Sequence, residues 1–355
     1  MDMLRSESQG NGLHQAWHDL RQNNPRLRAR DGARQLGVSE GELVASGCGR
    51  TAVRLKPRWQ PLLNALDSLG PVMALTRNEH AVHERHGRYR NIRFFGNMGL
   101  VLDEGIDLRL FLAHWHHAFA VTEQGADGSR QSLQVFDSDG TAVHKVYLTA
   151  QSDGAAYQEL LERFRDPDQD PVLNVFARPP APPPQSEEAI DVAGLQRHWD
   201  ALQDTHDFHD LLQEFGVTRI QAMRLAGSER AREVGPDALQ QVFESARDAE
   251  LPIMVFVGSP GVVQIHTGTV KRLYEVGEWY NVLDPAFNLH LRRPAVSSAW
   301  MVGKPTVDGP VHSLELYAED GQLILQVFGA RKPGKPENLR WRSLIQCLQP
   351  LRARA

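Results

Sequence analysis

The sequence is poor in cysteine and has no long apolar run. Its 355 residues include two cysteines, Cys48 and Cys347, which lie far apart and lack the spacing of a metal site. A disulfide framework is therefore not expected, which favours a reducing compartment. No apolar run approaches the roughly 20 residues that a membrane span needs, and residues 1–10 lack the apolar segment of a secretory signal. We expect a cytoplasmic protein without membrane insertion.

An excess of positive charge is also lacking. The formal net charge is −5 and 23% of the residues are charged, which argues against a general nucleic-acid binder but leaves room for a local basic patch. What the chain does have is length and hydrophobic content. With 41% hydrophobic residues it can form a full core, and 355 residues suggest two domains.

Helical and strand patterns follow each other in blocks. Residues 11–22, 28–37, 39–46 and 59–69 predict helices, the third with Ser39 as N-cap. From 72 to 149, short alternating apolar runs are separated by glycine turn signals, which is typical of a meandering antiparallel sheet. A helix over 155–165 and a proline-rich stretch follow, and the latter is typical of a stiff, solvated linker.

The block after the linker repeats the block before it. With an offset of 181, residues 71–148 align with 252–329 without a gap, and turn and core positions match together. The predicted fold class is α+β, a tandem duplication in which each copy has a large antiparallel sheet with helices. We expect the copies to be related by a pseudo-two-fold axis, with a ligand cleft between them. The predicted domains are an N-terminal repeat over 1–165, a proline-rich linker over 166–190 and a C-terminal repeat over 191–355.

One histidine pair distinguishes the second copy. Residues 194–215 predict a single helix, in which an apolar stripe starting at Leu195 and Trp199 continues into His206 and His209. Imidazole suits iron, copper or zinc and titrates near neutral pH. Two half-exposed histidines at a helix end are the alternative interpretation of this spacing.

Aligned positions of the two copies carry different chemistry. At four aligned positions the second copy has two imidazoles and two cations. The first copy has no imidazole at these positions, and it has carboxylates where the second copy has the cations. Such a combination suits a flat, metal-containing dianion, and haem with its two propionates is one. In the helical part the offset is 179, which aligns Leu27 with His206, Arg30 with His209 and Glu40 with Arg219; in the sheet part the offset of 181 aligns Glu123 with Lys304.

Several short stretches resemble one family. They are RARDGARQLGVS (28–39), MALTRNE (73–79) with VHE (82–84), DLRLFL (107–112), Thr-His (205–206) followed by Phe208, and QVFGAR (326–331). Each is modest alone, but their order and spacing over essentially the whole chain are specific. On these residues the sequence resembles the bacterial cytoplasmic haem-utilisation proteins, the hemin-degrading factors and haem carriers of the HemS/ChuS/PhuS type, and most of all the pseudomonad type of carrier.

The resemblance implies haem b (iron protoporphyrin IX) as the bound group, held between the second copy's helix and the first copy's sheet. It implies His206 as the axial iron ligand and Arg109 facing haem from the opposite side, and His209 is a candidate substitute ligand during transfer. Phe328 stands where related sequences can have tyrosine, and Asp207 where the most similar relatives have histidine, so one hydroxyl and one alternative ligand are missing. A polar, mostly cationic pocket for the propionates is implied at Arg219, Lys304, Gln326 and Arg331.

Two functions of different class use this pocket. The first is a carrier that accepts haem, with an inner-membrane importer as the source, and delivers it to a haem oxygenase for iron acquisition. We prefer it because two histidines at i, i+3 favour ligand exchange. The second is an enzyme that opens the haem ring with dioxygen and an external electron donor. A third, haem-dependent DNA binding through a helix-turn-helix-like segment at 28–46, is disfavoured because its second helix offers Glu40 and Glu42 to the bases.

Two further histidine groups leave alternatives open. His80, His83 and His86 have the chemistry of zinc ligands, but no other clustered ligand is near, so a solvated strand end is the preferred interpretation. The stretch 114–117 predicts sheet surface, with His114 and His116 on one strand face, and a secondary haem contact is the alternative.

Overall fold

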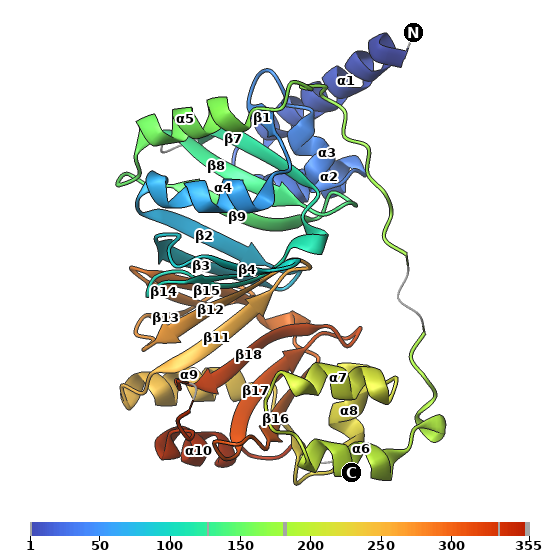
Figure 1. Cartoon of the computed structure of the whole chain (residues 1–355), viewed down its shortest axis with the longest axis vertical. Helices are drawn as coiled ribbons and strands as arrows, with labels where there is room; N and C mark the ends of the chain where they lie inside the picture. Colours follow the sequence, from blue (N-terminus) through green and yellow to red (C-terminus); the bar gives the residue numbers. More distant parts are fainter. Residues whose placement is uncertain (1, 126–127, 180–182, 333, 352–355) are drawn as a thin grey trace. The chain divides into compact units, whose positions relative to one another are not determined.

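The computed structural model describes residues 2–125, 128–179, 183–332 and 334–351. It confirms the predicted α+β class, because the strands form two large antiparallel sheets of nine strands each (Figure 1). Their strand orders are β1-β7-β8-β9-β2-β3-β15-β14-β13 and β10-β16-β17-β18-β11-β12-β6-β5-β4. No helix in the described ranges is both long and apolar enough to cross a membrane.

The helices and strands follow the predicted order of blocks. The first half contains α1 (Asp2–Asn23), α2 (Ala29–Leu36), α3 (Glu40–Ala45), β1 (Ala52–Leu55), α4 (Trp59–Ala65), η1 (Leu66–Leu69), β2 (Val72–Arg77), β3 (Ala81–Gly87), β4 (Arg93–Phe95), β5 (Met98–Leu102), β6 (Asp107–Phe111), η2 (Leu112–His114), β7 (His117–Gly125), β8 (Gly128–Phe136), β9 (Ala142–Leu148) and α5 (Gly154–Phe164). The second contains η3 (Glu187–Ala189), α6 (Val192–Asp200), α7 (Asp207–Glu214), α8 (Arg219–Leu225), β10 (Ala231–Val234), α9 (Ala238–Asp248), β11 (Ile253–Gly258), β12 (Val262–Gly268), β13 (Leu273–Val276), β14 (Trp279–Asp284), β15 (Phe287–Arg292), η4 (Arg293–Ala295), β16 (Ser298–Lys304), β17 (Val311–Tyr317), β18 (Leu323–Gly329) and α10 (Leu339–Gln346).

The chain divides into two compact units, each of which includes a short segment from the other half of the sequence. Unit 1 comprises Met1–Arg77, Glu84–Pro179 and Gly258–Gln264, and unit 2 comprises Asn78–His83, Pro180–Val257 and Ile265–Ala355. Residues 166–179, assigned to the linker from their composition, thus belong to unit 1. Arg54 Nη2 donates to the carbonyl oxygens of Asp170 (2.6 Å) and Val172 (2.9 Å), and Leu173 is buried.

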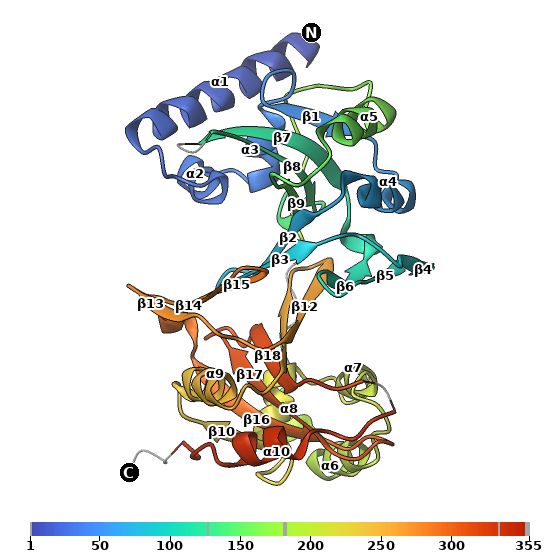
Figure 2. The same ribbon diagram turned by 90° about the vertical axis from the view of Figure 1, so that its left-hand side faces the viewer.

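In unit 1, helices cover both faces of the strands β1-β7-β8-β9-β2 (Figure 2). Alternation along β7 separates the two faces. Ala118 and Ala120 belong to the apolar cluster that includes α4 and α5, whereas Phe119 and Val121 belong to the cluster that includes α3. The predicted N-cap is confirmed, since Ser39 and Glu42 form a capping box at the start of α3.

Unit 2 uses the same arrangement on β10-β16-β17-β18-β11. Leu314 and Leu316 of β17 pack with α9 and α10, whereas Tyr317 packs with α6, α7 and α8. Figure 1 shows these three helices lying together beside β16 and β17. Ser313 and Glu315 alternate with the two leucines, so the sheet directs their side chains to the face that α6, α7 and α8 cover.

The predicted duplication is confirmed in the backbone itself. The register between strands shifts at Val135/Phe136 in the first copy and at Leu316/Tyr317 in the second, which are equivalent at the offset of 181. Three pairs of equivalent turn glycines also share a left-handed backbone, which favours glycine. Their φ values are 70° and 59° for Gly37 and Gly216, 60° and 58° for Gly96 and Gly277, and 78° and 80° for Gly140 and Gly321.

The single helix predicted over 194–215 is wrong. The structure has two helices, α6 and α7, separated by a turn over residues 201–206. The apolar residues of the predicted stripe are buried as expected, with Leu195 and Trp199 at 0% exposure, but His206 precedes α7 instead of continuing α6. The helix is interrupted because aspartate side chains bond to backbone N–H groups within the turn, in competition with the helical pattern.

Candidate functional site

His206 lies at the start of α7 in a turn built by two aspartates. Asp204 Oδ1 accepts the backbone N–H of His206 at 2.9 Å, and Asp207 Oδ2 accepts the backbone N–H of Asp204 at 3.0 Å. The same Asp204 oxygen lies 2.6 Å from His206 Nδ1. Because a carboxylate only accepts, Nδ1 carries the proton and Nε2 keeps its lone pair. With the side chain 87% exposed, His206 presents a metal-ligating nitrogen that is supported by a carboxylate.

A cation accompanies this imidazole. The backbone N–H of His206 lowers the pKa of Asp204, and the His206 ring and the Arg331 guanidinium lower it further. Arg331 Nη1 lies 4.0 Å from Asp308 Oδ2, and the Val307 N–H donates to the Gln203 carbonyl at 3.0 Å, which ties the loop after β16 to the turn before α7. Asp204, His206 and Arg331 thus form one neighbourhood of unit 2, which we call the His206 site.

His209 lies on α7, three residues after His206. Its Nε2 is 2.9 Å from the Gln213 side-chain nitrogen. An amide nitrogen only donates, so this ring nitrogen of His209 also keeps a lone pair. Asp207, noted in the sequence as a departure from histidine, serves the turn and adds no third imidazole.

Three of the four residues predicted to bind propionates converge on a carboxylate that the sequence analysis missed. Glu315, fully buried on β17, accepts from Arg219 Nε at 2.8 Å and Nη2 at 2.9 Å, from Lys304 Nζ at 2.9 Å and from Gln326 Nε2 at 2.9 Å. Two hydroxyl groups complete the set, from Tyr317 at 2.6 Å and Ser313 at 3.1 Å. We call these six residues the Glu315 cluster. Both of its cations therefore already have an internal anion.

The Glu315 cluster is connected to the histidine segment through Phe208. The Phe208 ring is 1% exposed, lies 4.4 Å from Lys304 Nζ and 4.9 Å from the Arg219 guanidinium carbon, and meets Trp199 edge-on at 4.7 Å. Cations over an aromatic face are attracted by its quadrupole, and more strongly when both are desolvated. Phe208 thus fixes the first turn of α7, and with it His206, to the Glu315 cluster.

Burial and charge act against each other in this cluster. Burial raises the pKa of the Glu315 carboxyl, but Arg219 and Lys304 outweigh it and hold that pKa well below the usual range. Burial also lowers the pKa of Lys304 to about 8, against the Glu315 carboxylate, which raises it. Lys304 is 4% exposed, so its ammonium group has little water to replace a lost partner.

The low pKa of Lys304 gives a test in the pH dependence of stability. Its pKa is about 8 in the folded chain and about 10.4 when unfolded, so between these values the unfolded chain binds the extra proton and the free energy of unfolding rises with pH. Lys304→Met should lose this rise, which is at most about 1 kcal/mol per pH unit. Urea unfolding at several pH values between 8 and 10 measures it. Lys271→Met, at an exposed position, is the control, and parallel curves for all three chains would contradict the shift.

Two predicted site residues, Arg109 and Phe328, have partners outside the Glu315 cluster. Arg109, on β6 in unit 1, pairs with Asp107 of the same strand and has a side chain 32% exposed. Phe328, on β18, packs its ring edge-on against Phe256 at 5.1 Å. Neither belongs to the Glu315 cluster, and their predicted roles toward haem stay predictions.

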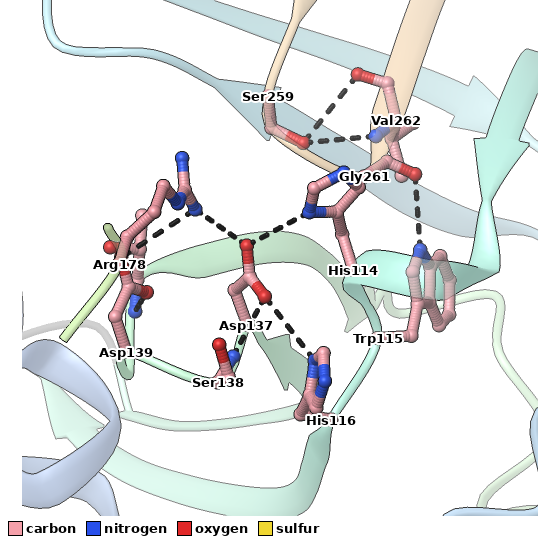
Figure 3. Close-up of polar contacts among 11 residues, drawn as sticks. His114, Trp115, His116, Asp137, Ser138, Asp139, Arg178, Ser259, Gly261 and Val262 are labelled. Carbon is pink, nitrogen blue, oxygen red and sulfur yellow. Dashed lines mark hydrogen bonds and ion pairs between the residues drawn. The ribbon is translucent and has the colours of Figure 1, made fainter. Parts of the chain in front are cut away.

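Three residues of the other histidine groups have partners within the fold. His83 is fully buried with its ring 4.9 Å from Phe287, so a solvated strand end is wrong for this residue. His114 and His116 converge on the buried carboxylate of Asp137, each through Nδ1 at 3.2 Å, and Arg178 Nη2 reaches it at 2.5 Å (Figure 3). This anchors the end of residues 166–179 to unit 1. Across the described residues, no three His, Cys, Asp or Glu side chains are placed to hold a metal ion.

Comparison with known proteins identifies the class of this chain. The family model described as "Haemin-degrading HemS.ChuX domain" matches residues 37–164 and 216–348, one segment in each copy. Hemin transport protein HmuS of Yersinia pestis is 42% identical over 334 residues, which is 94% of this chain and 96% of HmuS. The crystal structure of holo-PhuS, a heme-binding protein from Pseudomonas aeruginosa, shares 50% identity at a TM-score of 0.95 and covers 96% of this chain and 99% of PhuS.

A third similar protein carries a different function in its description. ChuS, described as an E. coli heme oxygenase, is 38% identical at a TM-score of 0.86, with 95% of this chain and 99% of that chain covered. These matches extend over nearly the whole chain and include both copies. The chain therefore belongs to the HemS/ChuX haemin-degrading domain family, as its motifs predicted.

Proposed function

We propose that this chain binds haem b through His206 and carries it in the cytoplasm from an importer to a haem oxygenase. The observation that supports this most is the hydrogen bond from His206 Nδ1 to Asp204, which leaves Nε2 of an exposed ring free to ligate iron. The family membership and the PhuS and HmuS descriptions point to the same cargo. Haem supplies an iron with an open axial position and two carboxylates.

The residues around His206 have separate tasks in this proposal. Asp204 orients the imidazole and fixes the proton on Nδ1. Arg331 lies beside Asp204, and its side chain is 21% exposed. Its guanidinium pairs with a propionate and gives up the 4.0 Å contact with Asp308. Arg219 and Lys304 contribute to the local positive charge, but together with Gln326 they act mainly by holding Phe208 and α7 in place through Glu315.

Exposure of the two histidines favours transfer over storage. His206 is 87% exposed, and His209 lies three residues further on, with an Nε2 lone pair that becomes available to iron when its hydrogen bond with Gln213 opens. Haem that is held by one exposed ligand dissociates more readily than haem in a closed pocket, and a second imidazole within one turn offers an intermediate foothold. This is the behaviour that a carrier needs.

An assay of ring opening separates the carrier from an enzyme, the alternative that the ChuS description favours. Haem-loaded protein is incubated with a physiological reductase and with catalase, which removes peroxide that would degrade haem non-enzymatically. The carrier proposal expects intact haem until a haem oxygenase is added, after which haem leaves the protein. Stoichiometric tetrapyrrole product with repeated turnover in the absence of the oxygenase would refute it.

A further inference from the structure

Unit 2 contains a cavity that lies outside the His206 site and the Glu315 cluster. It has a volume of about 380 Å³ and opens between the start of α9, the turn from β13 to β14, and η4 (Figure 2). Three buried leucines and Val296 give it an apolar lining, and the leucines are Leu239, Leu291 and Leu316. An apolar pocket with a few polar groups is the usual form of a small-molecule site.

Two tryptophans of the first copy correspond to smaller residues that line this cavity. Trp115 aligns with Val296 at the offset of 181, and Trp59 aligns with Leu239 at an offset of 180. The offset of 180 also aligns the buried residues of the two helical segments, which are Leu62, Leu63 and Leu66 in the first copy and Val242, Phe243 and Ala246 in the second. The second copy therefore lacks two aromatic rings at the place where the cavity lies.

In the first copy, the two tryptophan rings pack together in the apolar core. Trp59 and Trp115 meet edge-on with their ring centroids 5.7 Å apart, and both pack in the cluster that includes α4 and α5. Trp115 is 4% exposed, and its Nε1–H donates to the Gly261 carbonyl at 3.0 Å. A buried indole needs such an acceptor for its N–H. The first copy thus shows what this part of the fold accommodates, an indole ring with one hydrogen-bond partner.

One hydroxyl group of the cavity lining lacks a partner. Tyr280 is 2% exposed, and its hydroxyl oxygen has no hydrogen-bond partner among the residues that the structure describes. Burial, then Glu244, raises the pKa of this hydroxyl, so it keeps its proton. A buried hydroxyl without a partner costs free energy. The equivalent position in the first copy is Gly99, so this hydroxyl is particular to the second copy.

The charged residues of the lining are already satisfied. Arg293 pairs with Glu275, and Glu278 lies 3.1 Å from Arg292 Nε. Asp237, at the N-cap of α9, is exposed to water. A charged ligand would have to compete with these partners and with water, whereas an uncharged ligand leaves them unchanged. The lining therefore favours an uncharged ligand.

We propose that this cavity binds an uncharged, planar heteroaromatic molecule of the indole class, with its ring against Leu239 and Val296 and its N–H donated to the Tyr280 hydroxyl oxygen. The ring takes the place that Trp115 has in the first copy, and Tyr280 takes the role of the Gly261 carbonyl. An aliphatic ligand would fill the space but leave the hydroxyl without a partner. The inference does not depend on the proposed function, because the cavity lining shares no residue with the His206 site or the Glu315 cluster.

Calorimetric titration of the full chain with indole tests this site. Wild type is expected to bind one indole per chain. Val296→Trp, which introduces the ring of the first copy, should abolish this binding. Val307→Trp adds the same ring at a position that is 75% exposed and outside the cavity, so it is the matched control and should bind indole as wild type does. Tyr280→Phe should weaken indole binding by about 2–10-fold, the loss of one hydrogen bond, and leave binding of 1-methylindole, which has no N–H, unchanged.

Thermal unfolding gives a second measurement that needs no ligand. Because Tyr280→Phe removes a buried hydroxyl without a partner, it should leave the Tm of the free chain unchanged or raise it. A lower Tm would show that the hydroxyl is already satisfied and would refute its role toward a ligand. This variant keeps the test valid if Val296→Trp does not fold.

The outcomes separate this inference from the proposed function. His206→Ala should lose hemin affinity and keep indole binding, so either site can fail alone. No saturable indole binding by wild type, retained binding in a folded Val296→Trp, or an equal loss in Val307→Trp would refute the indole site. Equal affinity of wild type for indole and 1-methylindole would refute the hydrogen bond to Tyr280.

Discussion

Replacing His206 by alanine should weaken hemin binding at the His206 site by more than 100-fold and shift its Soret band. Loss of a partner of a metal ligand typically costs 10–100-fold in affinity, and here the ligand itself is removed. Asp204→Asn keeps the imidazole but removes the charge that orients it, so it should fall within about 10–100-fold. Equilibrium titration followed by visible spectroscopy measures both variants.

Two control substitutions on α7 show whether the loss of affinity is specific to His206. Asp210→Asn on α7 removes an exposed carboxylate that lies outside the turn, and it should leave the affinity unchanged. His209→Ala should mainly slow transfer to an acceptor such as apomyoglobin, with little change in affinity. If His209→Ala loses the Soret band and His206→Ala keeps it, the two histidines have been assigned in the wrong order.

The sequence predicted the elements whose signals are local. Capping residues and turn glycines depend on a few neighbouring side chains, so α3 begins after Ser39 and the left-handed Gly140 and Gly321 fall where the repeat placed them. The break between α6 and α7 was missed because the apolar periodicity of 194–215 continues across it. Only the side chains of Asp204 and Asp207, bonded back to the turn, decide against a continuous helix.

The nature of the propionate pocket could not be predicted from charge differences alone. In the alignment of the two copies, Arg219 and Lys304 stand at the positions of Glu40 and Glu123. This difference indicated extra positive charge in the second copy. The structure shows that the balancing anion, Glu315, lies in the strand sequence Ser-Leu-Glu-Leu-Tyr, where an acid between leucines on an interior strand was the available signal. Its equivalent Gln134 is neutral, and Lys145 of the first copy instead pairs with Glu40 at 2.5 Å. Each copy thus pairs its charges internally but at different positions, with Lys145 of β9 bound to Glu40 of α3 in the first copy and Glu315 of β17 bound to Arg219 of α8 in the second.

Replacing Glu315 by alanine should have the largest effect on stability, a loss of about 3–5 kcal/mol, because it removes the carboxylate that pairs with the buried Lys304 and the half-buried Arg219. Arg219 and Lys304 both bond to this carboxylate, and Lys304 is 4% exposed. Urea unfolding at pH 7 measures the loss. Gln134→Ala is the matched control in the first copy. It removes an amide bonded to Ser132 at 3.0 Å and leaves no uncompensated charge, so it should cost less than Glu315→Ala.

A second substitution distinguishes lost charge pairing from lost packing. Glu315→Gln/Lys304→Met removes one buried anion and one buried cation together, and replacing buried charge pairs by apolar groups is often close to neutral. The double variant should therefore be more stable than Glu315→Ala by about 2 kcal/mol or more. Phe208 would keep the Arg219 guanidinium, 4.9 Å away, but lose the ammonium at 4.4 Å. If the folded double variant binds hemin more weakly than wild type while Gln134→Ala does not, the Glu315 cluster positions His206 through Phe208. Equal hemin affinity in wild type, the double variant and Gln134→Ala would limit the role of the Glu315 cluster to stability.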